Sequence, residues 1–291
     1  MGKALAETCP AARRVFEEAD DALGFPLSRL CFEGPEDQLK LTENTQPALL
    51  TVSAAAFAVL KDHGLGAPDY VAGHSLGEYS ALVAARSLEF SAAVRLVRQR
   101  GRYMQEAVPP GVGAMAALLK LPQGKLDAVL ADAARGEIVS AANLNAPDQV
   151  VIAGHAGAVN RAVELAKAAG ARRAVLLPVS APFHCALMAP AQQRLRADLD
   201  STAFADLDFP LVNNWQAREV RTGAEAREGL YHQVPNPVRW ADSIRYLAAQ
   251  GVSRFVEVGA GSVLTGLLRN IDPSLAGAKF GEPADLDKLR A

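Results

Sequence analysis

The chain has 291 residues, of which 50% are hydrophobic and 21% charged, and its formal net charge is −2 at pH 7. This balance excludes a disordered chain, and it supplies neither the basic field that attracts nucleic acid nor the lysine clusters that attract anionic membranes. The longest apolar stretch, residues 49–60, is too short to span a bilayer. We therefore expect one large domain, or one large and one smaller domain, whose function depends on a local site.

Three cysteines, Cys9, Cys31 and Cys185, are too few and too scattered for a disulfide framework. No cysteine or histidine pair has zinc-ligand spacing. The first residues lack the apolar core of a secretory signal, and Ala6 stands where a myristoylation signal has serine or threonine. We expect a cytoplasmic monomer that uses no metal and no cofactor and contacts neither nucleic acid nor a membrane.

The first hundred residues are predicted to be mostly helical. Residues 11–23 have an amphipathic pattern, and a second helix covers residues 47–62, with its proline as the first helical residue. A short strand at 69–72 is followed at once by a helix that begins at Leu76. Another helix covers residues 91–107.

The pattern changes between residues 113 and 180. Strand-like runs and two helical runs follow one another in the order βαββαβ, which is the ferredoxin-like arrangement. The predicted elements are strands at 114–121, 138–145, 149–153 and 173–179, and helices at 124–134 and 158–169. We expect residues 111–181 to be a small domain inserted into a large α/β domain, which residues 1–110 and 182–291 form.

A helix at 187–199, a strand at 210–213 and a last strand–turn–helix, "RFVEVGAGSVLTGLLRN", complete the chain. The turn of that last unit resembles the dinucleotide fingerprint G-x-G-x-x-G through Gly259 and Gly261. Leu264 replaces its third glycine, and the acidic residue expected about 20 residues further on has no predicted strand to carry it. The glycines therefore indicate close packing of a strand on a helix, not a nucleotide site.

The stretch "GHSLG", residues 73–77, matches the nucleophile elbow G-x-S-x-G, and it lies between a predicted strand and a predicted helix. Such a sharp turn strains the serine backbone, and we expect a side chain at Gly73 or Gly77 to collide with a neighbouring element. Ser75 then lies at a helix N-terminus, where free N–H groups favour an oxyanion. A simple N-cap serine remains the alternative interpretation.

Arg100 lies on the wrong face of its predicted helix. At about 100° per residue, Arg95, Arg98 and Arg102 share one face, whereas Arg100 falls among apolar residues. A buried guanidinium stays charged and needs an anionic partner. That partner is either an internal carboxylate or the carboxylate of a substrate held by both guanidinium nitrogens.

An acyl-serine mechanism needs a base, and His184 in "PVSAPFHCALM" is the best of the five histidines. It follows a predicted strand and a proline turn at the expected domain boundary, where clefts form. A histidine packed in the core beside Phe183 is the alternative interpretation. Cys185 is predicted to be packing, because sequence neighbours seldom meet as nucleophile and base.

Seven segments together resemble the malonyl-CoA:acyl carrier protein transacylase family along nearly the whole chain. They are "GHSLGEYSALVAA", "RGRYMQEAVP", "GAMAA", "NLNAPDQVVIAG", "PVSAPFHCALM", "NPVRW" and "EVGAGSVLTGLL". The resemblance implies an α/β-hydrolase-like large domain with a ferredoxin-like insertion. It also implies a ping-pong transfer of malonyl from the coenzyme A thioester to the phosphopantetheine thiol of acyl carrier protein.

The resemblance assigns roles to individual residues. Ser75 carries the malonyl group, and His184 acts as general base and acid, oriented by the backbone carbonyl of Gln233. Arg100 binds the malonyl carboxylate, and the Leu76 N–H stabilises the oxyanion. His74 and Phe183 are also expected at the substrate, and the resemblance links the bulky Phe183 and the non-glutamine Leu76 with malonyl rather than methylmalonyl.

The family begins with a central strand and a "GQGSQ" loop, and this sequence starts just after the end of that loop. We expect one strand and its turn, roughly 15 to 20 residues, to be absent, which leaves two sheet edges unpaired and Leu76 as the one oxyanion donor. Loss of one donor slows such a reaction about 10²- to 10³-fold. Either the start site is misassigned, or the product is weak or inactive.

Two other functions stay open at this point. A serine esterase or thioesterase shares the elbow, but its histidine comes late in the chain, whereas more than a hundred residues follow His184. The second alternative is a truncated, non-catalytic remnant that only binds carrier protein. Lys120, Arg172 and Arg173 are candidate docking residues for an acidic carrier protein.

Overall fold

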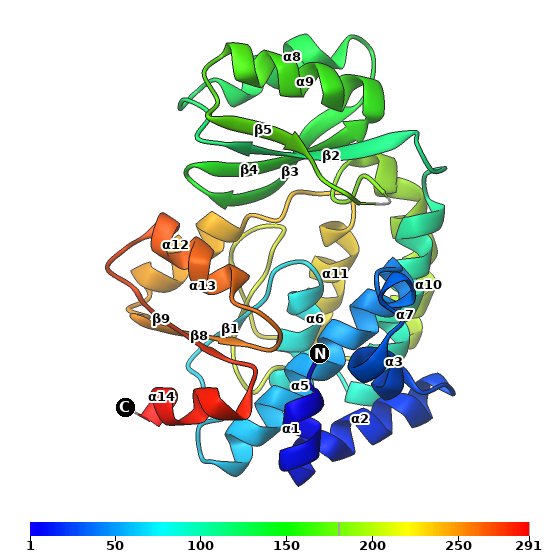
Figure 1. The fold of residues 1–291 in the computed structure, drawn as a ribbon, viewed down its shortest axis with the longest axis vertical. Coiled ribbons are helices and arrows are strands. Elements are labelled where there is room, and N and C mark those ends of the chain that lie inside the picture. The colour runs from blue at the N-terminus through cyan, green and yellow to red at the C-terminus, as the bar shows by residue number, and fades with distance from the viewer. Residues whose placement is uncertain (180, 291) are drawn as a thin grey trace.

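The computed structural model describes residues 1–179 and 181–290 (Figure 1). Ser180 and Ala291, which fall inside the predicted domain limits, lie outside the described residues. The fold is mixed α/β, as predicted. The described helices include none with the length and apolar character needed to cross a membrane.

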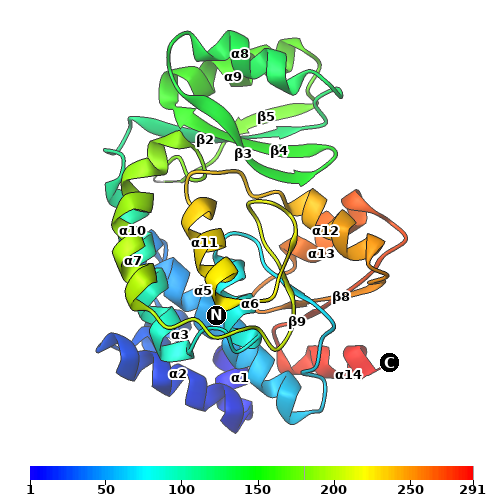
Figure 2. The same ribbon diagram turned by 180° about the vertical axis from the view of Figure 1, so that it is seen from behind.

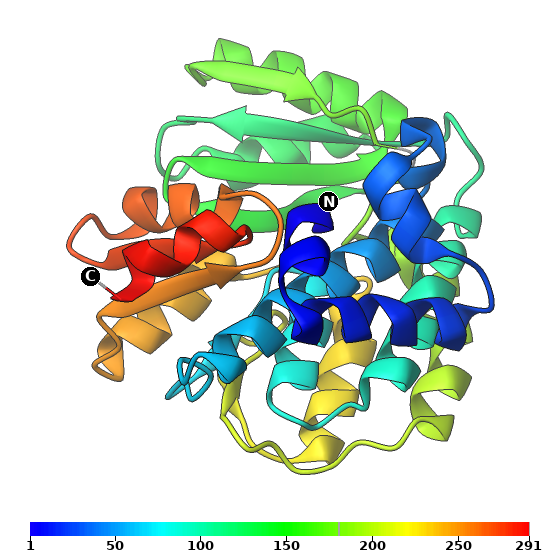
Figure 3. The same cartoon turned by 60° about the horizontal axis from the view of Figure 1, so that its bottom comes forward.

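The N-terminal part of the chain is helical. It contains α1 (Lys3–Thr8), α2 (Pro10–Leu23), α3 (Leu27–Glu33), α4 (Glu36–Leu39) and α5 (Thr42–Asp62). Buried apolar side chains of α2 and α5 belong to the largest core cluster, which confirms the amphipathic pattern of the first predicted helix. Helix α1 lies beside the C-terminal end of the chain, against the short 3₁₀ turn Pro283–Asp285 (Figure 3).

The predicted start of the second helix was wrong. Helix α5 begins at Thr42, so Pro47 lies inside it rather than at its first position. A proline there has no N–H to donate to the Glu43 carbonyl four residues earlier, so the first turn of the helix lacks one backbone hydrogen bond. Side chains of that turn connect it to the preceding helix α4. The Asn44 amide donates to the Gln38 carbonyl at 2.9 Å, and the Thr45 hydroxyl donates to the Leu39 carbonyl at 2.6 Å.

Residues 113–176 form a four-stranded sheet with two helices, which we call the ferredoxin-like unit. Its elements are β2 (Gly113–Leu119), α8 (Leu126–Ala134), β3 (Val139–Ala146), β4 (Gln149–His155), α9 (Ala156–Ala168) and β5 (Arg173–Leu176). The antiparallel strand order β3-β4-β2-β5 confirms the predicted βαββαβ arrangement. Figure 1 shows α8 and α9 on one face of the sheet and the rest of the molecule on the other.

Strand β5 ends three residues earlier than predicted. Its register with β2 runs to Leu176, and the Leu177 N–H still donates to the Met115 carbonyl at 2.8 Å. The next residue is Pro178, which has no N–H to continue the ladder.

The rest of the chain alternates short strands with helices. Its elements are β1 (Val71–Ala72), α6 (Leu76–Ala84), α7 (Phe90–Glu106), α10 (Ala189–Ser201), β6 (Leu211–Val212), β7 (Glu219–Val220), α11 (Gly223–Gln233), α12 (Trp240–Ala249), β8 (Arg254–Val258), α13 (Val263–Ile271), β9 (Ala276–Phe280) and α14 (Leu286–Arg290). Strand β1 pairs in parallel with β6, and β8 pairs in parallel with β9. Both β1 and β8 are edge strands of their sheets.

The ferredoxin-like unit rests on the segment that carries the predicted base. Buried side chains of its sheet, among them Met115 and Ala153, pack against Cys185. The Cys185 thiol is 1% exposed and contacts the Pro182 carbonyl at 3.1 Å, and burial raises its pKa to about 11. These contacts confirm the prediction that Cys185 is a packing residue. Behind this segment, α7, α10 and α11 run side by side (Figure 2).

Candidate active site

Ser75 occupies a strained turn between β1 and α6. Its backbone has φ 51° and ψ −106°, a region that residues with a side chain seldom adopt. Hydrogen bonds on both sides of the residue hold this conformation. The Ser75 N–H donates to the Asn214 side-chain oxygen at 2.7 Å, and the Ser75 carbonyl accepts from the Gln233 side-chain amide at 2.9 Å. The strained turn is what the elbow pattern predicts.

The two glycines of the elbow differ in the space that is available for a side chain. A Cβ on Gly73 would lie 2.0 Å from the carbonyl carbon of Gly77, so this position admits no side chain. A Cβ on Gly77 would meet nothing within 4 Å, so the predicted collision at Gly77 was wrong. The close approach is one-sided, because the Cβ direction of Gly73 points at the backbone of α6, whereas that of Gly77 points into open space.

His184 lies against the serine hydroxyl. Its Nε2 is 2.7 Å from Ser75 Oγ, and its Nδ1 is 3.0 Å from the Gln233 backbone carbonyl. Since a carbonyl only accepts, Nδ1 carries the hydrogen and Nε2 is free to accept the serine proton. Burial, with the nearby Arg100 charge, lowers the pKa of His184 to about 3, so the imidazole is neutral at physiological pH. This is the protonation state that a general base needs.

Arg100 is buried on the inner face of α7, as the helical pattern predicts, while Arg95 and Arg102 are exposed. Its Nη1 donates to Gln46 Oε1 at 2.6 Å, and its Nη2 donates to Gln233 Oε1 at 2.9 Å and to Ser75 Oγ at 3.1 Å. All three acceptors are neutral. Within the described chain, no carboxylate lies within 4.0 Å of the Arg100 guanidinium. An internal salt bridge, the alternative at the sequence level, is therefore wrong for the described residues.

The other predicted site residues are Leu76, His74 and Phe183, and each has its own contacts near Ser75 and His184. Leu76 is the first residue of α6, where backbone N–H groups have no partner within the helix. His74 points to Asn145 of the ferredoxin-like unit, with Nε2 and Oδ1 2.8 Å apart, and its ring lies 5.7 Å from that of Trp240. Phe183, next to His184 in the chain, is half-buried and packs against two apolar clusters.

Sequence reasoning missed four polar residues of the site: Gln46, Glu78, Asn145 and Asn214. Glu78 is fully buried on α6, and Asn214 follows β6, whose parallel pairing with β1 brings their carboxyl ends together. Glu78 could have been found from the sequence, because it lies about one helical turn after the elbow serine and so on the same side of the predicted helix. Nothing in the sequence around Gln46 marks it, because it contacts Arg100 only through packing of α5 on α7.

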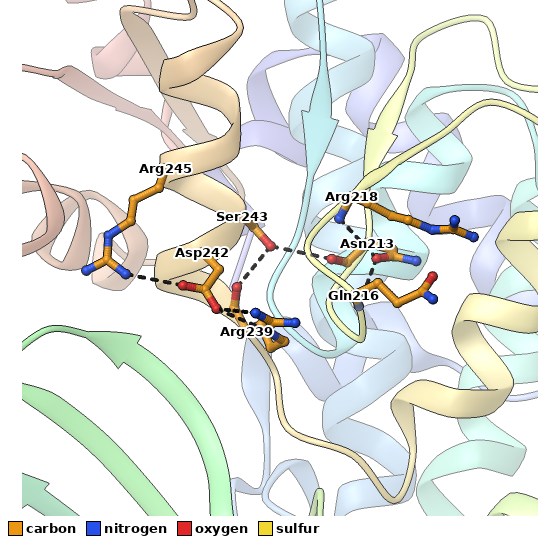
Figure 4. A network of polar contacts seen from close by, with 7 residues as sticks. All are labelled: Asn213, Gln216, Arg218, Arg239, Asp242, Ser243 and Arg245. Atoms are coloured by element: carbon orange, nitrogen blue, oxygen red, sulfur yellow. Dashed lines mark hydrogen bonds and ion pairs between the residues drawn. The ribbon is translucent and has the colours of Figure 1, made fainter. Parts of the chain in front are cut away.

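The loop that carries Asn214 is held by its own polar network (Figure 4). The Asn213 side-chain oxygen accepts from the Gln216 N–H at 3.1 Å, and the Ser243 hydroxyl donates to the Asn213 carbonyl at 3.4 Å. Asp242 pairs with Arg239 at 2.9 Å and with Arg245 at 3.2 Å on the neighbouring helix α12. The Asn213 contacts hold the turn after β6, and the Arg239 N–H donates to the Asn214 carbonyl at 3.0 Å, which connects this turn to the start of α12.

Comparison with known proteins agrees with this geometry. The family model described as an acyl transferase domain matches residues 1–276. The chain belongs to the acyl transferase family. It is 48% identical over 280 residues to the malonyl CoA-acyl carrier protein transacylase of Escherichia coli O157:H7, covering 96% of this chain and 91% of the relative.

Solved acyl transferase structures have the same fold. The acyl carrier protein S-malonyltransferase of Vibrio cholerae superposes with a TM-score of 0.97 at 44% identity, covering 99% of this chain and 94% of that one. A malonyl-transacylase solved in complex with a type II polyketide synthase acyl-carrier protein superposes with a TM-score of 0.96 at 45% identity, covering 99% of this chain and 93% of that one. This acyl transferase therefore resembles enzymes of malonyl transfer in sequence and in fold.

Proposed function

We propose that this acyl transferase moves a malonyl group from malonyl-CoA to the phosphopantetheine thiol of an acyl carrier protein, through an ester on Ser75. One observation carries the proposal. The buried Arg100 guanidinium lies 3.1 Å from Ser75 Oγ, and no carboxylate of the described chain lies within 4.0 Å of it, although the charge of Glu78 acts on it from farther away. An acyl group that carries its own carboxylate supplies the missing anion.

The first half-reaction loads the serine. As Ser75 Oγ forms its bond to the thioester carbonyl carbon, its proton passes to His184 Nε2. The resulting oxyanion lies at the N-terminus of α6, where the Leu76 N–H is the proposed donor. Collapse of this intermediate breaks the carbon–sulfur bond, and the departing coenzyme A sulfur takes the proton from His184. The product is malonyl-Ser75 and free coenzyme A.

The second half-reaction follows the same path in reverse. The carrier thiol gives its proton to His184 as its sulfur attacks the ester carbonyl, and the proton returns to Ser75 Oγ when the ester bond breaks. Gln233 serves both steps, because its backbone carbonyl keeps His184 in the tautomer whose Nε2 faces the serine. A carbonyl in this place orients the imidazole without adding a charge beside it.

The Arg100 guanidinium selects the acyl group in this proposal. In the free protein its two terminal nitrogens contact Gln46, Gln233 and Ser75. A malonyl carboxylate would receive two N–H groups from it, in the fork geometry that suits a carboxylate. An uncharged acetyl group would leave the guanidinium without an anion, so it would bind less well.

The docking site for the carrier remains a prediction. Lys120, Arg172 and Arg173 are exposed and line one shallow cavity together with Asn270 of α13. Their charge suits an acidic carrier protein.

Intact-protein mass spectrometry after incubation with malonyl-CoA tests the proposal. We expect one malonyl adduct on the wild-type protein, none on Ser75→Ala, and loss of the adduct when carrier protein is added. Equal labelling of the two proteins would contradict the role of Ser75. An adduct released to water at the same rate with and without carrier protein would favour an esterase instead, and a folded wild type with no adduct would favour a non-catalytic remnant.

A further inference from the structure

Glu78 is a buried carboxylate that the proposed reaction does not use. It lies on α6 and is 0% exposed, and among the described residues no lysine or arginine nitrogen comes within 4.0 Å of it. Its Oε2 accepts from the Asn214 N–H and from the Gln233 side-chain amide, each at 2.9 Å, while Oε1 has no hydrogen-bond partner. Burial raises its pKa to about 7, although both hydrogen bonds oppose the shift. A buried acid without an ion pair destabilises a fold, so its presence calls for a reason.

The two residues that Glu78 touches hold every reacting group of the site. Gln233 contacts His184 through its backbone carbonyl, Arg100 through its side-chain oxygen, and the Ser75 carbonyl through its side-chain nitrogen. Asn214 accepts from the Ser75 N–H and donates to the Gly73 carbonyl at 2.7 Å. The Glu78 carboxylate is therefore connected through a single intervening residue to the nucleophile, the base and the guanidinium.

The Gln233 amide must point in one direction for this arrangement to work. Its oxygen faces the Arg100 donor, and its nitrogen faces three acceptors: the Ser75 carbonyl, Glu78 Oε2 and, at a longer 3.4 Å, the Asn214 side-chain oxygen. Without Glu78, one of the two short contacts that fix this direction is lost, and the longer one to Asn214 loses the carboxylate that also holds the Asn214 backbone. A flipped amide would turn its NH₂ group toward the Arg100 guanidinium, where two donors would oppose each other.

We propose that Glu78 is a positioning residue, whose carboxylate holds Gln233 and Asn214 so that the Arg100 guanidinium and the His184 imidazole both face Ser75. The role rests on the proposed malonyl transfer and adds to it a residue that touches no substrate atom. This role predicts that malonyl transfer depends on the position of the acceptor oxygen of residue 78. It also predicts that transfer does not depend on the negative charge of that side chain.

Three substitutions separate these requirements. Glu78→Gln keeps an oxygen for both donors and places its NH₂ where Oε1 has no partner. Glu78→Asp keeps the charge but withdraws the oxygen by one methylene. Glu78→Ala removes both. We expect the rate constant of malonyl loading to fall about 10- to 100-fold in Glu78→Asp and Glu78→Ala, and to stay within about 3-fold of wild type in Glu78→Gln.

A selectivity readout distinguishes positioning from a general loss of stability. Each variant is given malonyl-CoA or acetyl-CoA, and the ratio of the two loading rates is compared. Because Glu78 acts through Arg100, the ratio should fall at least 5-fold in Glu78→Asp and Glu78→Ala. Glu257→Ala is a matched control, since Glu257 also accepts backbone N–H bonds, from Leu264 and Thr265, but lies on β8. It should lower the melting temperature and leave the ratio unchanged.

The outcomes are distinct. If the wild type acquires no malonyl adduct, the proposed function fails and the positioning role with it. If the wild type loads while Glu78→Asp and Glu78→Ala keep its rate and ratio, only the positioning role fails. Wild-type behaviour of Glu78→Asp with an impaired Glu78→Gln would show that charge matters instead of position, and would also overturn it. Circular dichroism identifies a variant that does not fold, and the remaining two then decide.

Discussion

The ferredoxin-like unit and the strands beneath the site are built by different means. In the unit, β2, β3 and β4 have seven or eight residues each and pair along their length by backbone hydrogen bonds. Beneath the site, β1 and β6 have two residues each. Buried side chains of Glu78, Asn214 and Gln233 connect the segments there instead.

This difference separates stability from function along the chain. A backbone ladder tolerates changes of side chain as long as the apolar face is kept. A network of side-chain hydrogen bonds has no such redundancy, because each missing partner leaves a buried polar group unpaired. Changes at the site should therefore alter which acyl group is loaded, whereas changes in the buried apolar core of the ferredoxin-like unit, away from Asn145, should alter how stably the chain is folded.

The largest effect is expected for Arg100→Ala. This change removes the guanidinium that contacts Ser75 Oγ, so kcat/KM for malonyl-CoA should fall about 10²- to 10³-fold. Loading of acetyl-CoA should be kept or increased, because no carboxylate is then required. Stopped-flow or quenched loading assays with both thioesters measure the two rates. A parallel loss of both would show that Arg100 supports the fold and not the choice of acyl group.

Substitution of Gly73 should come next. A Cβ at Gly73 would lie 2.0 Å from backbone carbon and oxygen of Gly77, so Gly73→Ala should reduce the free energy of unfolding by about 1–3 kcal/mol and displace the elbow. Gly77→Ala is the matched control. It meets open space inside α6 and should be neutral or stabilising, by up to about 1 kcal/mol. Urea unfolding of the wild type and the two variants measures these changes. An equal loss of unfolding free energy in both variants would contradict the one-sided contact.

A smaller effect is expected from pH. The folded chain keeps His184 neutral down to a pKa of about 3, whereas an unfolded histidine gains a proton near pH 6.5. The stability that His184 supplies is present above pH 6.5 and is lost as pH falls from 6.5 toward 3. At pH 5, which is about 1.5 units below the pKa of an unfolded histidine, the free energy of unfolding should be lower by about 2 kcal/mol, because one unit corresponds to about 1.4 kcal/mol.

His184→Gln isolates this contribution, because glutamine does not titrate. Between pH 7.5 and pH 5, urea unfolding should show the wild type losing about 2 kcal/mol more than the variant. If the free energies of unfolding of the two proteins change in parallel over this pH range, His184 titrates normally in the folded chain.

The smallest effect is expected in the ferredoxin-like unit. Ile152 on β4 is fully buried between the sheet and its helices. Ile152→Val should lower the free energy of unfolding by about 0.5–1.5 kcal/mol and leave the malonyl-to-acetyl ratio at the wild-type value. A changed ratio would show that packing in this unit reaches the acyl-binding residues, and the division between the two regions would not hold.

Much of the fold could be predicted from periodicity alone. The ferredoxin-like unit was found from the order of its apolar strand-like runs and its helical runs, and α2 and α7 because they are amphipathic. The inward direction of Arg100 followed from the same helical pattern. Strands of two residues, such as β1, β6 and β7, carry too little pattern to be bounded from the sequence.

The polar support of the site could not be predicted for a different reason. Ser75 and Gly73 lie in one local motif, so five residues were enough to find them. Gln46 and Asn214 meet the site only after distant helices and strands have packed, and a single glutamine or asparagine in a sequence carries no sign of its partner. His184 was chosen among five histidines from the strand and the proline turn before it at the expected domain boundary, and the family resemblance then supported this choice.

The structure of the malonyl-loaded protein tests the central claim most directly. We expect the ester on Ser75 to place the malonyl carboxylate on the two terminal nitrogens of Arg100, each within about 3 Å, with the guanidinium released from Ser75 Oγ. A loaded structure in which that carboxylate faces solvent, or lies on another cation, would contradict the account.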